Sequence, residues 1–353
     1  MFRRVSALLA LTITVSAPLF ASNAVMADGA DGAGGIGAIG IQLLDVPTNL
    51  ADDPRARVYI VDHVAPGTTI QRRAQVANKT HHSVQLSLYV GSATIGGGAF
   101  IPADDQDPTD LTSWTSLSRS QVTLPPGSRR TVMATIRVPS TASNGERYGV
   151  IWASTTAGPP PGGGVTVVNR VGIRIYLSVG PGGEPTSAFT VESLTASRLP
   201  DGRPMVQAQV HNTGGRALDM EGYLRLSDRP DGLSAGPFEA QLGTTLAPGD
   251  TASVTVPLAN GLPAGPWLAR IDLHSGLVEA TAQATITFPA EPGSSAAPVA
   301  AETSSSRWPF ILAICLASAA LLGVLGWLRA RRRPDGGTSP QTAVKKSAKT
   351  VQR

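Results

Sequence analysis

The chain has 353 residues, 42% of them hydrophobic, and a formal net charge of +4. Residues 28–307 carry 24 acidic against 19 basic side chains, so the basic excess belongs to the C-terminal residues 329–353. Because the excess positive charge lies outside the folded part, the positive net charge does not indicate that the folded part binds nucleic acid. The one cysteine is Cys315, so residues 28–307 hold no disulfide, and no cysteine follows the N-terminal segment to carry a lipid anchor.

Residues 1–27 have the pattern of a secretory signal peptide. Arg3 and Arg4 precede a mostly apolar run over residues 5–20, and residues 25–27 read Val-Met-Ala, with small or β-branched side chains where cleavage is defined. We predict cleavage after Ala27, with an uncleaved anchor as the alternative. The next segment, residues 28–40, is rich in Gly and Ala and is predicted to be a flexible N-terminus.

The clearest strand pattern covers residues 165–179. Apolar side chains fall on one face of this segment, with Asn169 the exception, and polar ones on the other. A period of two over 15 residues predicts a half-buried strand. The apolar positions are Val165, Val167, Val171, Ile173, Ile175, Leu177 and Val179.

Weaker copies of this alternation recur along the chain, at residues 84–90, 132–138, 206–210 and 278–288. Pro-Gly, Asn-Gly and Asp-Gly pairs separate them and predict turns. Many short strands at such spacing predict an all-β fold with two tandem immunoglobulin-like β-sandwich domains. We place the first domain at 41–180, the linker at 181–187 and the second domain at 188–288.

An internal echo supports two related domains. The sequence Gln-Val-Ala-Asn at 75–78 matches Gln-Val-His-Asn at 209–212, and each ends a predicted strand. A Pro-Gly pair follows later in each half, at 126–127 and at 248–249. The intervals differ, so we interpret the echo as two versions of one architecture.

The C-terminal residues predict a single membrane anchor. Residues 289–307 are rich in Pro, Ser and Ala and form the predicted stalk. Residues 308–328 contain no charge, carry Trp near both ends, and would form a helix of about 31 Å. The basic tail at 329–353 places the C-terminus in the cytoplasm and the N-terminus outside the cell membrane, as a single-pass protein.

The residues that bear chemistry give weak signals. Four carboxylates in one loop offer hard oxygen ligands for Ca²⁺, although the loop lacks the Gly and Glu of an EF-hand, and a solvated surface loop is the alternative. The five His residues are scattered, and no catalytic or phosphate-binding motif occurs. We therefore expect no enzyme activity and no cofactor. The carboxylates of the weak Ca²⁺ candidate are Asp104, Asp105, Asp107 and Asp110.

One aromatic residue allows two interpretations. Strand alternation places Tyr148, Val150 and Trp152 on one face of residues 148–153. We expect Trp152 to anchor the core of the first sandwich, since residues 165–179 offer a matching apolar face. The alternative is an aromatic platform for a sugar.

Several segments resemble the WxL-interacting proteins of Gram-positive surfaces. They read VYIVDHVAPG at 58–67, QVAN at 75–78, VTLPPG at 122–127, IRVP at 136–139 and a Gly-containing strand at 145–151. The resemblance implies peptidoglycan binding by the first domain and contact with other surface proteins or a host by the second. The chain departs from that family in its short second domain and in the strand after Gly145. No binding residue carries over.

These observations predict a membrane-anchored, extracellular, non-catalytic protein that binds peptidoglycan, another cell-wall polymer or other surface proteins. An alternative is an assembly or chaperone-type factor that pairs with secreted partners through an edge strand. The strand 165–179 is the candidate edge, with Arg174 facing the partner. A second alternative is a cell-wall hydrolase in which the fold brings two carboxylates together.

Overall fold

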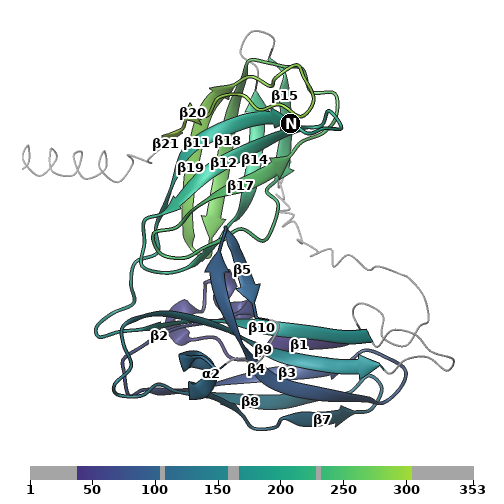
Figure 1. The fold of residues 1–353 in the computed structure, drawn as a ribbon, viewed down its shortest axis with the longest axis vertical. Helices are drawn as coiled ribbons and strands as arrows, with labels where there is room; N and C mark the ends of the chain where they lie inside the picture. The colour runs from purple at the N-terminus through teal and green to yellow at the C-terminus, as the bar shows by residue number, and fades with distance from the viewer. Residues whose placement is uncertain (1–37, 104–107, 158–166, 228–231, 304–353) are drawn as a thin grey trace, which may run out of the picture.

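The computed structural model describes residues 38–103, 108–157, 167–227 and 232–303. They form two β-sandwiches, the second of which stands upright across one end of the first (Figure 1). The predicted all-β class is confirmed. Three short helical turns occur in the described part, η1 (Thr48–Leu50), α1 (Pro54–Val58) and α2 (Asp110–Trp114).

Several predicted segments lie outside the described residues. They are the signal peptide at 1–27, most of the Gly/Ala-rich segment at 28–40, the apolar stretch at 308–328 and the tail at 329–353. Within the described residues, no helix combines the length and apolar character that a membrane crossing requires.

Two sheets face each other in the first sandwich. One has the order β1-β3-β8-β6, and the other β2-β10-β9-β4-β5, with β7 also paired to β4. Among the described strands of this sandwich, only β2 runs parallel to its neighbour, along the last five residues of β10. The strands are β1 (Ile39–Leu43), β2 (Ile60–Val64), β3 (Thr69–Asn78), β4 (Val84–Gly96), β5 (Ala99–Pro102), β6 (Thr115–Leu117), β7 (Gln121–Leu124), β8 (Arg129–Arg137), β9 (Gly145–Ala157) and β10 (Val167–Val179).

The core of the first sandwich follows from the alternation along its long strands. Ile173, Ile175 and Leu177 of β10 are buried with Ile151 of β9 and Ile136 of β8, which belongs to the opposite sheet. The described end of the predicted strand, Ile173–Val179, therefore packs with its apolar side inward, as its period of two indicated.

A charged pair interrupts this apolar core. Asp62 of β2 and Arg72 of β3 meet between the two sheets, with 8% and 17% of their side chains exposed. Burial raises the pKa of Asp62, and the Arg72 charge opposes that rise. Breaking such a pair would leave one buried charge without a partner, so each residue requires the other.

The second sandwich repeats the two-sheet plan. Its sheets have the orders β17-β12-β11-β20 and β15-β14-β18-β19-β21, and β13 pairs with β16 beside them. An apolar core lies between the two large sheets. The strands are β11 (Phe189–Arg198), β12 (Pro204–Asn212), β13 (Leu218–Asp219), β14 (Glu221–Ser227), β15 (Ser234–Glu239), β16 (Thr245–Leu246), β17 (Thr251–Pro257), β18 (Trp267–Ser275), β19 (Val278–Ile286), β20 (Val299–Ala300) and β21 (Glu302–Thr303).

The second sandwich continues past its predicted end at residue 288. Strand β20 pairs with β11, and β21 pairs with β19. Residues up to 303 thus supply hydrogen-bond partners for main-chain groups at the edges of two sheets. Part of the predicted stalk at 289–307 therefore pairs with strands of the second sandwich.

The sequence echo corresponds to one structural device used twice. Asn78 ends β3, and its side-chain amide donates to the carbonyls of His82, Leu124 and Pro125. Asn212 ends β12 and donates in the same way to the carbonyls of Arg216, Leu246 and Ala247. Each buried asparagine ties the end of its strand to the turn that carries the following Pro-Gly pair.

Candidate functional site

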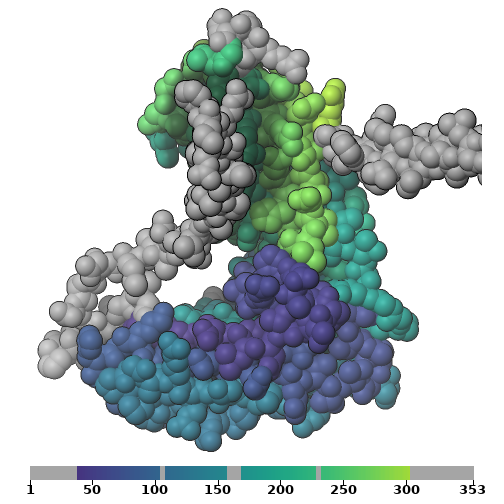
Figure 2. Space-filling model, turned by 180° about the vertical axis from the view of Figure 1, so that it is seen from behind, coloured from purple at the N-terminus to yellow at the C-terminus, as the bar shows by residue number. Residues whose placement is uncertain are grey.

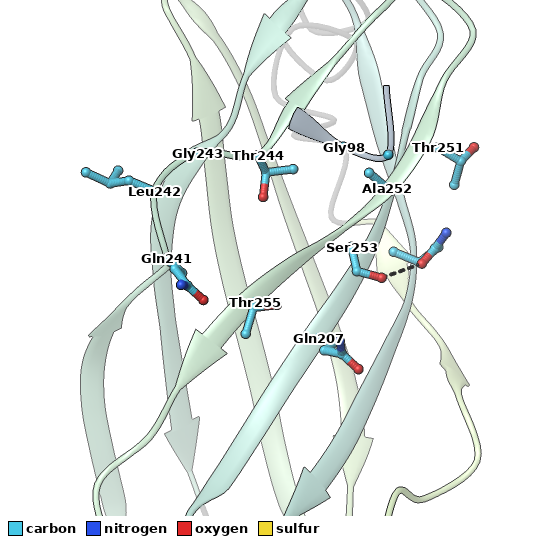
Figure 3. Close-up of a pocket in the computed structure, with 12 residues that line it drawn as sticks. Gly98, Gln207, Gln241, Leu242, Gly243, Thr244, Thr251, Ala252, Ser253 and Thr255 are labelled. Carbon is cyan, nitrogen blue, oxygen red and sulfur yellow. Dashed lines mark hydrogen bonds between the residues drawn. The ribbon is translucent and has the colours of Figure 1, made fainter. Parts of the chain in front are cut away.

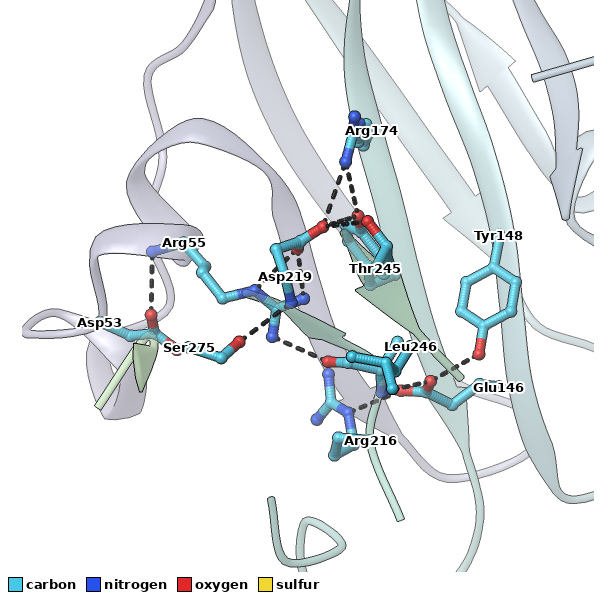
Figure 4. Close-up of polar contacts among 12 residues, drawn as sticks. Asp53, Arg55, Glu146, Tyr148, Arg174, Arg216, Asp219, Thr245, Leu246 and Ser275 are labelled. Carbon is cyan, nitrogen blue, oxygen red and sulfur yellow. Dashed lines mark hydrogen bonds and ion pairs between the residues drawn. The ribbon is translucent and has the colours of Figure 1, made fainter. Parts of the chain in front are cut away.

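The two sandwiches meet through a buried cluster of charged and tyrosine side chains. Asp219 of the second sandwich lies at its centre and accepts from residues on α1 and β10 of the first (Figure 4). Arg55 Nε donates to Asp219 Oδ2 at 3.0 Å, and Arg174 Nη1 and Tyr176 Oη donate to Oδ1 at 3.1 and 2.8 Å. Thr245 Oγ1 completes the set at 2.9 Å.

A second group of contacts extends this cluster. Arg216 Nε donates to Glu146 Oε1 at 2.8 Å, and Arg216 Nη1 also binds Glu184. Tyr148 Oη donates to Glu146 Oε2 at 2.8 Å, and so does the main-chain N–H of Ala217 at 2.7 Å. We call this set the junction cluster; it comprises Arg55, Glu146, Tyr148, Arg174, Tyr176, Glu184, Arg216, Asp219 and Thr245.

The side chains of the junction cluster are largely buried, which indicates a structural role. Only 3% of the Arg216 side chain and 5% of the Glu146 side chain are exposed. Burial raises the pKa of Tyr176 and of Tyr148, so both phenols stay protonated as donors. Burial alone would lower the pKa of Arg55, but the Asp219 charge offsets this and raises it. The cluster fixes how the two sandwiches meet.

A hairpin of the first sandwich makes a further contact. The β4–β5 hairpin reaches up to the second sandwich, where its tip residue Gly98 accepts from the main-chain N–H of Thr245 at 2.9 Å. Ala99 also forms a bridge with Thr244. From behind, the purple and blue surface of the first sandwich rises to meet the green surface of the second (Figure 2).

Beside this hairpin lies a groove of about 590 Å³, which we call the junction groove. Its walls come from the hairpin tip, from the outer face of β12 and β17, and from the segment before β16 (Figure 3). Every polar side chain that lines it is an uncharged amide or hydroxyl. The lining residues are Gly97, Gly98, Gln207, Gln209, Gln241, Leu242, Gly243, Thr244, Thr251, Ala252, Ser253 and Thr255.

The polar side chains of the groove are ordered by the pairing of β12 with β17. Gln207 stands opposite Thr255, and Gln209 opposite Ser253. Ser253 Oγ donates to Gln209 Oε1 at 2.9 Å. Amides and hydroxyls both donate and accept, so this surface suits an uncharged ligand rich in hydrogen-bonding groups.

The edge of β17 forms part of the same groove. Strand β17 is the last strand of its sheet, and β12 pairs with it on one side only. On the other side, Gln241 N–H donates to the carbonyl of Thr255 at 2.7 Å. Outside its pairing with β12, the main chain of Ser253 has no hydrogen bond to a residue that the structure describes, so the edge is open there.

The predicted calcium ligands do not form a site in the described part of the chain. Asp104, Asp105 and Asp107 lie outside the described residues. Asp110 begins α2, where its carboxylate pairs with Arg147 at 3.1 Å. No group of three or more metal-ligating side chains occurs among residues that the structure describes.

Other sequence predictions are placed as follows. Arg174, which we expected to face a partner, instead donates to Asp219 within the junction cluster. Strand β10 is paired to β9 along its length and to β2 over Ile175–Val179. Glu146 and Glu184 do come together, but around Arg216 in a buried contact, which is unlike an open two-carboxylate cleft.

The expected core position of Trp152 is wrong. Its neighbours Ile151 and Ala153 face the core, whereas Trp152 lies on the outer face of the sheet. Its indole lies over two glycines, because a Cβ at Gly91 would meet Nε1 at 2.8 Å and one at Gly172 would meet Cε3 at 2.7 Å. The Arg170 guanidinium stacks 4.8 Å from the ring centre. The sugar-platform interpretation stays a prediction.

Comparison with known proteins assigns no family to the chain. No family model and no curated protein matches it. Among solved structures, the YadV chaperone is 11% identical over 70% of this chain and 100% of its own, with a TM-score of 0.38. The class 5 fimbriae chaperone CfaA is 11% identical over 69% and 98%, with a TM-score of 0.35.

A chain from the complex of the Salmonella enterica SafA pilin with the SafB chaperone is 9% identical over 74% of this chain and 94% of its own, with a TM-score of 0.35. Similarities this low do not assign a function. They also do not test the resemblance to WxL-interacting proteins, which stays a prediction.

Proposed function

We propose that this chain is an extracytoplasmic, non-catalytic protein, anchored by the apolar stretch 308–328, that holds a polypeptide segment of a secreted partner in the junction groove. The observation that carries the proposal is the open edge of β17 inside a groove lined by uncharged donors and acceptors. A polypeptide main chain presents one donor and one acceptor per residue, which matches this surface.

The proposal favours the assembly-factor interpretation and moves its site from β10 to β17. A charged wall polymer would need opposite charges, and the groove lining supplies none. An uncharged glycan usually stacks on an aromatic ring, and no aromatic residue is among those that line the groove. Wall-polymer binding is therefore the competing outcome of the experiment.

The test is photo-cross-linking of the full chain in its own cells. A benzophenone amino acid replaces Gln241, an exposed groove residue whose side chain points toward Thr255 (Figure 3). The matched control places the same amino acid at Tyr223, which is 41% exposed on β14 in the other sheet. Cross-linked products are identified by mass spectrometry.

We expect adducts that contain secreted polypeptides at position 241 and none above background at position 223. Adducts with glycan fragments at 241 would instead assign the groove to a wall polymer. Equal labelling at both positions, or no adduct at 241, would overturn the proposal.

A further inference from the structure

We infer that the bound segment joins the second sandwich as an additional strand along β17, held by main-chain groups of Thr251 and Ser253. This inference rests on the proposed function and specifies how the partner is recognised. The partner segment would be extended and would carry small, uncharged side chains. Such strand addition takes its affinity from main-chain hydrogen bonds and its selectivity from the side chains.

The direction of the main-chain groups along β17 supports this geometry. In an antiparallel pair, successive residues point their N–H and C=O groups alternately toward and away from the neighbouring strand. The carbonyl of Asp250 points toward β12, where it accepts from Asn212 N–H at 2.9 Å. The carbonyl of Thr255 points away, toward Gln241. Thr251 and Ser253 therefore also point their main-chain groups away from β12, into the groove.

Two contacts limit the length of the open edge. At one end, Gln241 already occupies the carbonyl of Thr255. At the other, the hairpin tip lies against Ala252, since a Cβ at Gly98 would be only 2.8 Å from the Ala252 Cβ. Because the tip contacts Ala252 through its side chain, the open main-chain edge runs from Thr251 to Ser253, about 10 Å for three residues. The site therefore takes a brief extended segment.

The side-chain preference follows from the groove lining. An added strand would place alternate side chains beside Thr251 and Ser253 on the outer face of the sheet. The surrounding groups are hydroxyls and amides, with no opposite charge among the lining residues to pair with a buried ionic group. A charged side chain there would lose hydration without compensation, so small uncharged residues are favoured.

The experiment measures binding of a defined probe to the purified full chain. The probe is a dye-labelled, terminally blocked heptapeptide of alternating Thr and Val, and its affinity is read by fluorescence anisotropy. Ser253→Pro removes the main-chain N–H on an edge strand, where proline is tolerated. Ser253→Ala is the matched control, because it removes the hydroxyl and keeps that N–H.

We expect Ser253→Pro to weaken binding about tenfold or more and Ser253→Ala to change it less than about threefold, as expected for losing a main-chain hydrogen bond rather than an exposed hydroxyl. A second arm uses the same peptide with N-methyl groups on alternate residues. One of its two N-methyl registers should bind about tenfold more weakly to the unaltered protein. This arm decides the question if Ser253→Pro lowers the melting temperature.

The results separate the inference from the proposed function. If groove cross-links to secreted polypeptides form, but the probe binds equally to both Ser253 variants and in all N-methyl forms, strand addition is wrong and the proposed function stands. Failure of the unmodified probe to bind also overturns the inference. Absence of any cross-link at position 241 overturns the proposed function itself.

Discussion

The junction cluster and the junction groove lie side by side between the same two sandwiches, yet their polar groups are used in opposite ways. In the cluster, the Asp219 carboxylate receives hydrogen bonds from Arg55, Arg174, Tyr176 and Thr245. In the groove, the lining is uncharged, and the edge of β17 keeps main-chain groups open at Ser253.

The difference shows how one chain can use separate polar groups to join its two domains and to bind a ligand. Charges buried between two domains must find partners in the same molecule, since an unpaired buried charge is costly. Uncharged amides and hydroxyls facing water carry no such requirement, so they are free to exchange water for a ligand. Burial and pairing, more than polarity itself, thus distinguish a structural contact from a candidate binding surface.

The largest expected effect comes from removing the centre of the junction cluster. Asp219→Ala leaves Arg55 and Arg174 facing each other without their carboxylate, so unfolding free energy should fall by about 3–5 kcal/mol. Urea denaturation of the full chain measures this loss. Asp201→Asn is the control, because its pair with Arg203 is exposed and its loss should change stability little. Equal stabilities for the two variants would refute the structural role of the cluster.

The second-largest effect is expected at alkaline pH, which should lower the free energy of unfolding through the junction cluster. The folded-state pKa of Tyr176 is raised by burial, so above pH about 10 the unfolded chain releases a proton that the folded chain retains. Stability is then lost as pH rises, by about 1.4 kcal/mol per pH unit for each such tyrosine. Tyr176→Phe should reduce this slope between about pH 10 and 11, because the unfolded chain loses the phenolic proton as the pH passes the ordinary tyrosine pKa of about 10. An unchanged slope would contradict the burial of the phenol.

A smaller effect is expected at the hairpin tip that forms one wall of the groove. Gly97 and Gly98 have φ angles of +57° and +77°, so alanine at either position costs about 1–2 kcal/mol. Only Gly98→Ala also presses on Ala252, whereas nothing lies within 4 Å of a Cβ at Gly97. Gly98→Ala should therefore melt lower than Gly97→Ala and bind the peptide probe more weakly. Identical behaviour of the two variants would show that the tip does not shape the groove.

The groove itself should be almost insensitive to pH. None of its lining residues titrates. Probe affinity should therefore change less than about twofold between about pH 7.5 and 9.5, a window above the ordinary histidine pKa and below that of tyrosine. Anisotropy titrations across this range give the measurement. A larger change would mean that a charged group outside the groove takes part in binding.

Much of the fold follows from local sequence patterns. Alternation along residues 165–179 predicts β10 and its buried face, because a strand in a sandwich exposes every second side chain. The paired Gln-Val-x-Asn segments predict two related sandwiches, and the structure gives the reason, since Asn78 and Asn212 each tie a strand to a Pro-Gly turn.

The junction could not be predicted in this way. Arg55 and Asp219 are 164 residues apart, and in sequence each is indistinguishable from a solvated surface charge. The position of Trp152 depends on Gly91 and Gly172 in neighbouring strands, which alternation within its own strand does not reveal. The groove likewise combines a hairpin tip of one sandwich with an edge strand of the other.

The most direct test of the account is hydrogen–deuterium exchange of the full chain, alone and with the partner captured at position 241. The account predicts slower exchange at the amides of Thr251 and Ser253 in β17, with little change along β10. Protection confined to β10, or to the sheet face that carries Trp152, with β17 unchanged, would contradict binding in the junction groove.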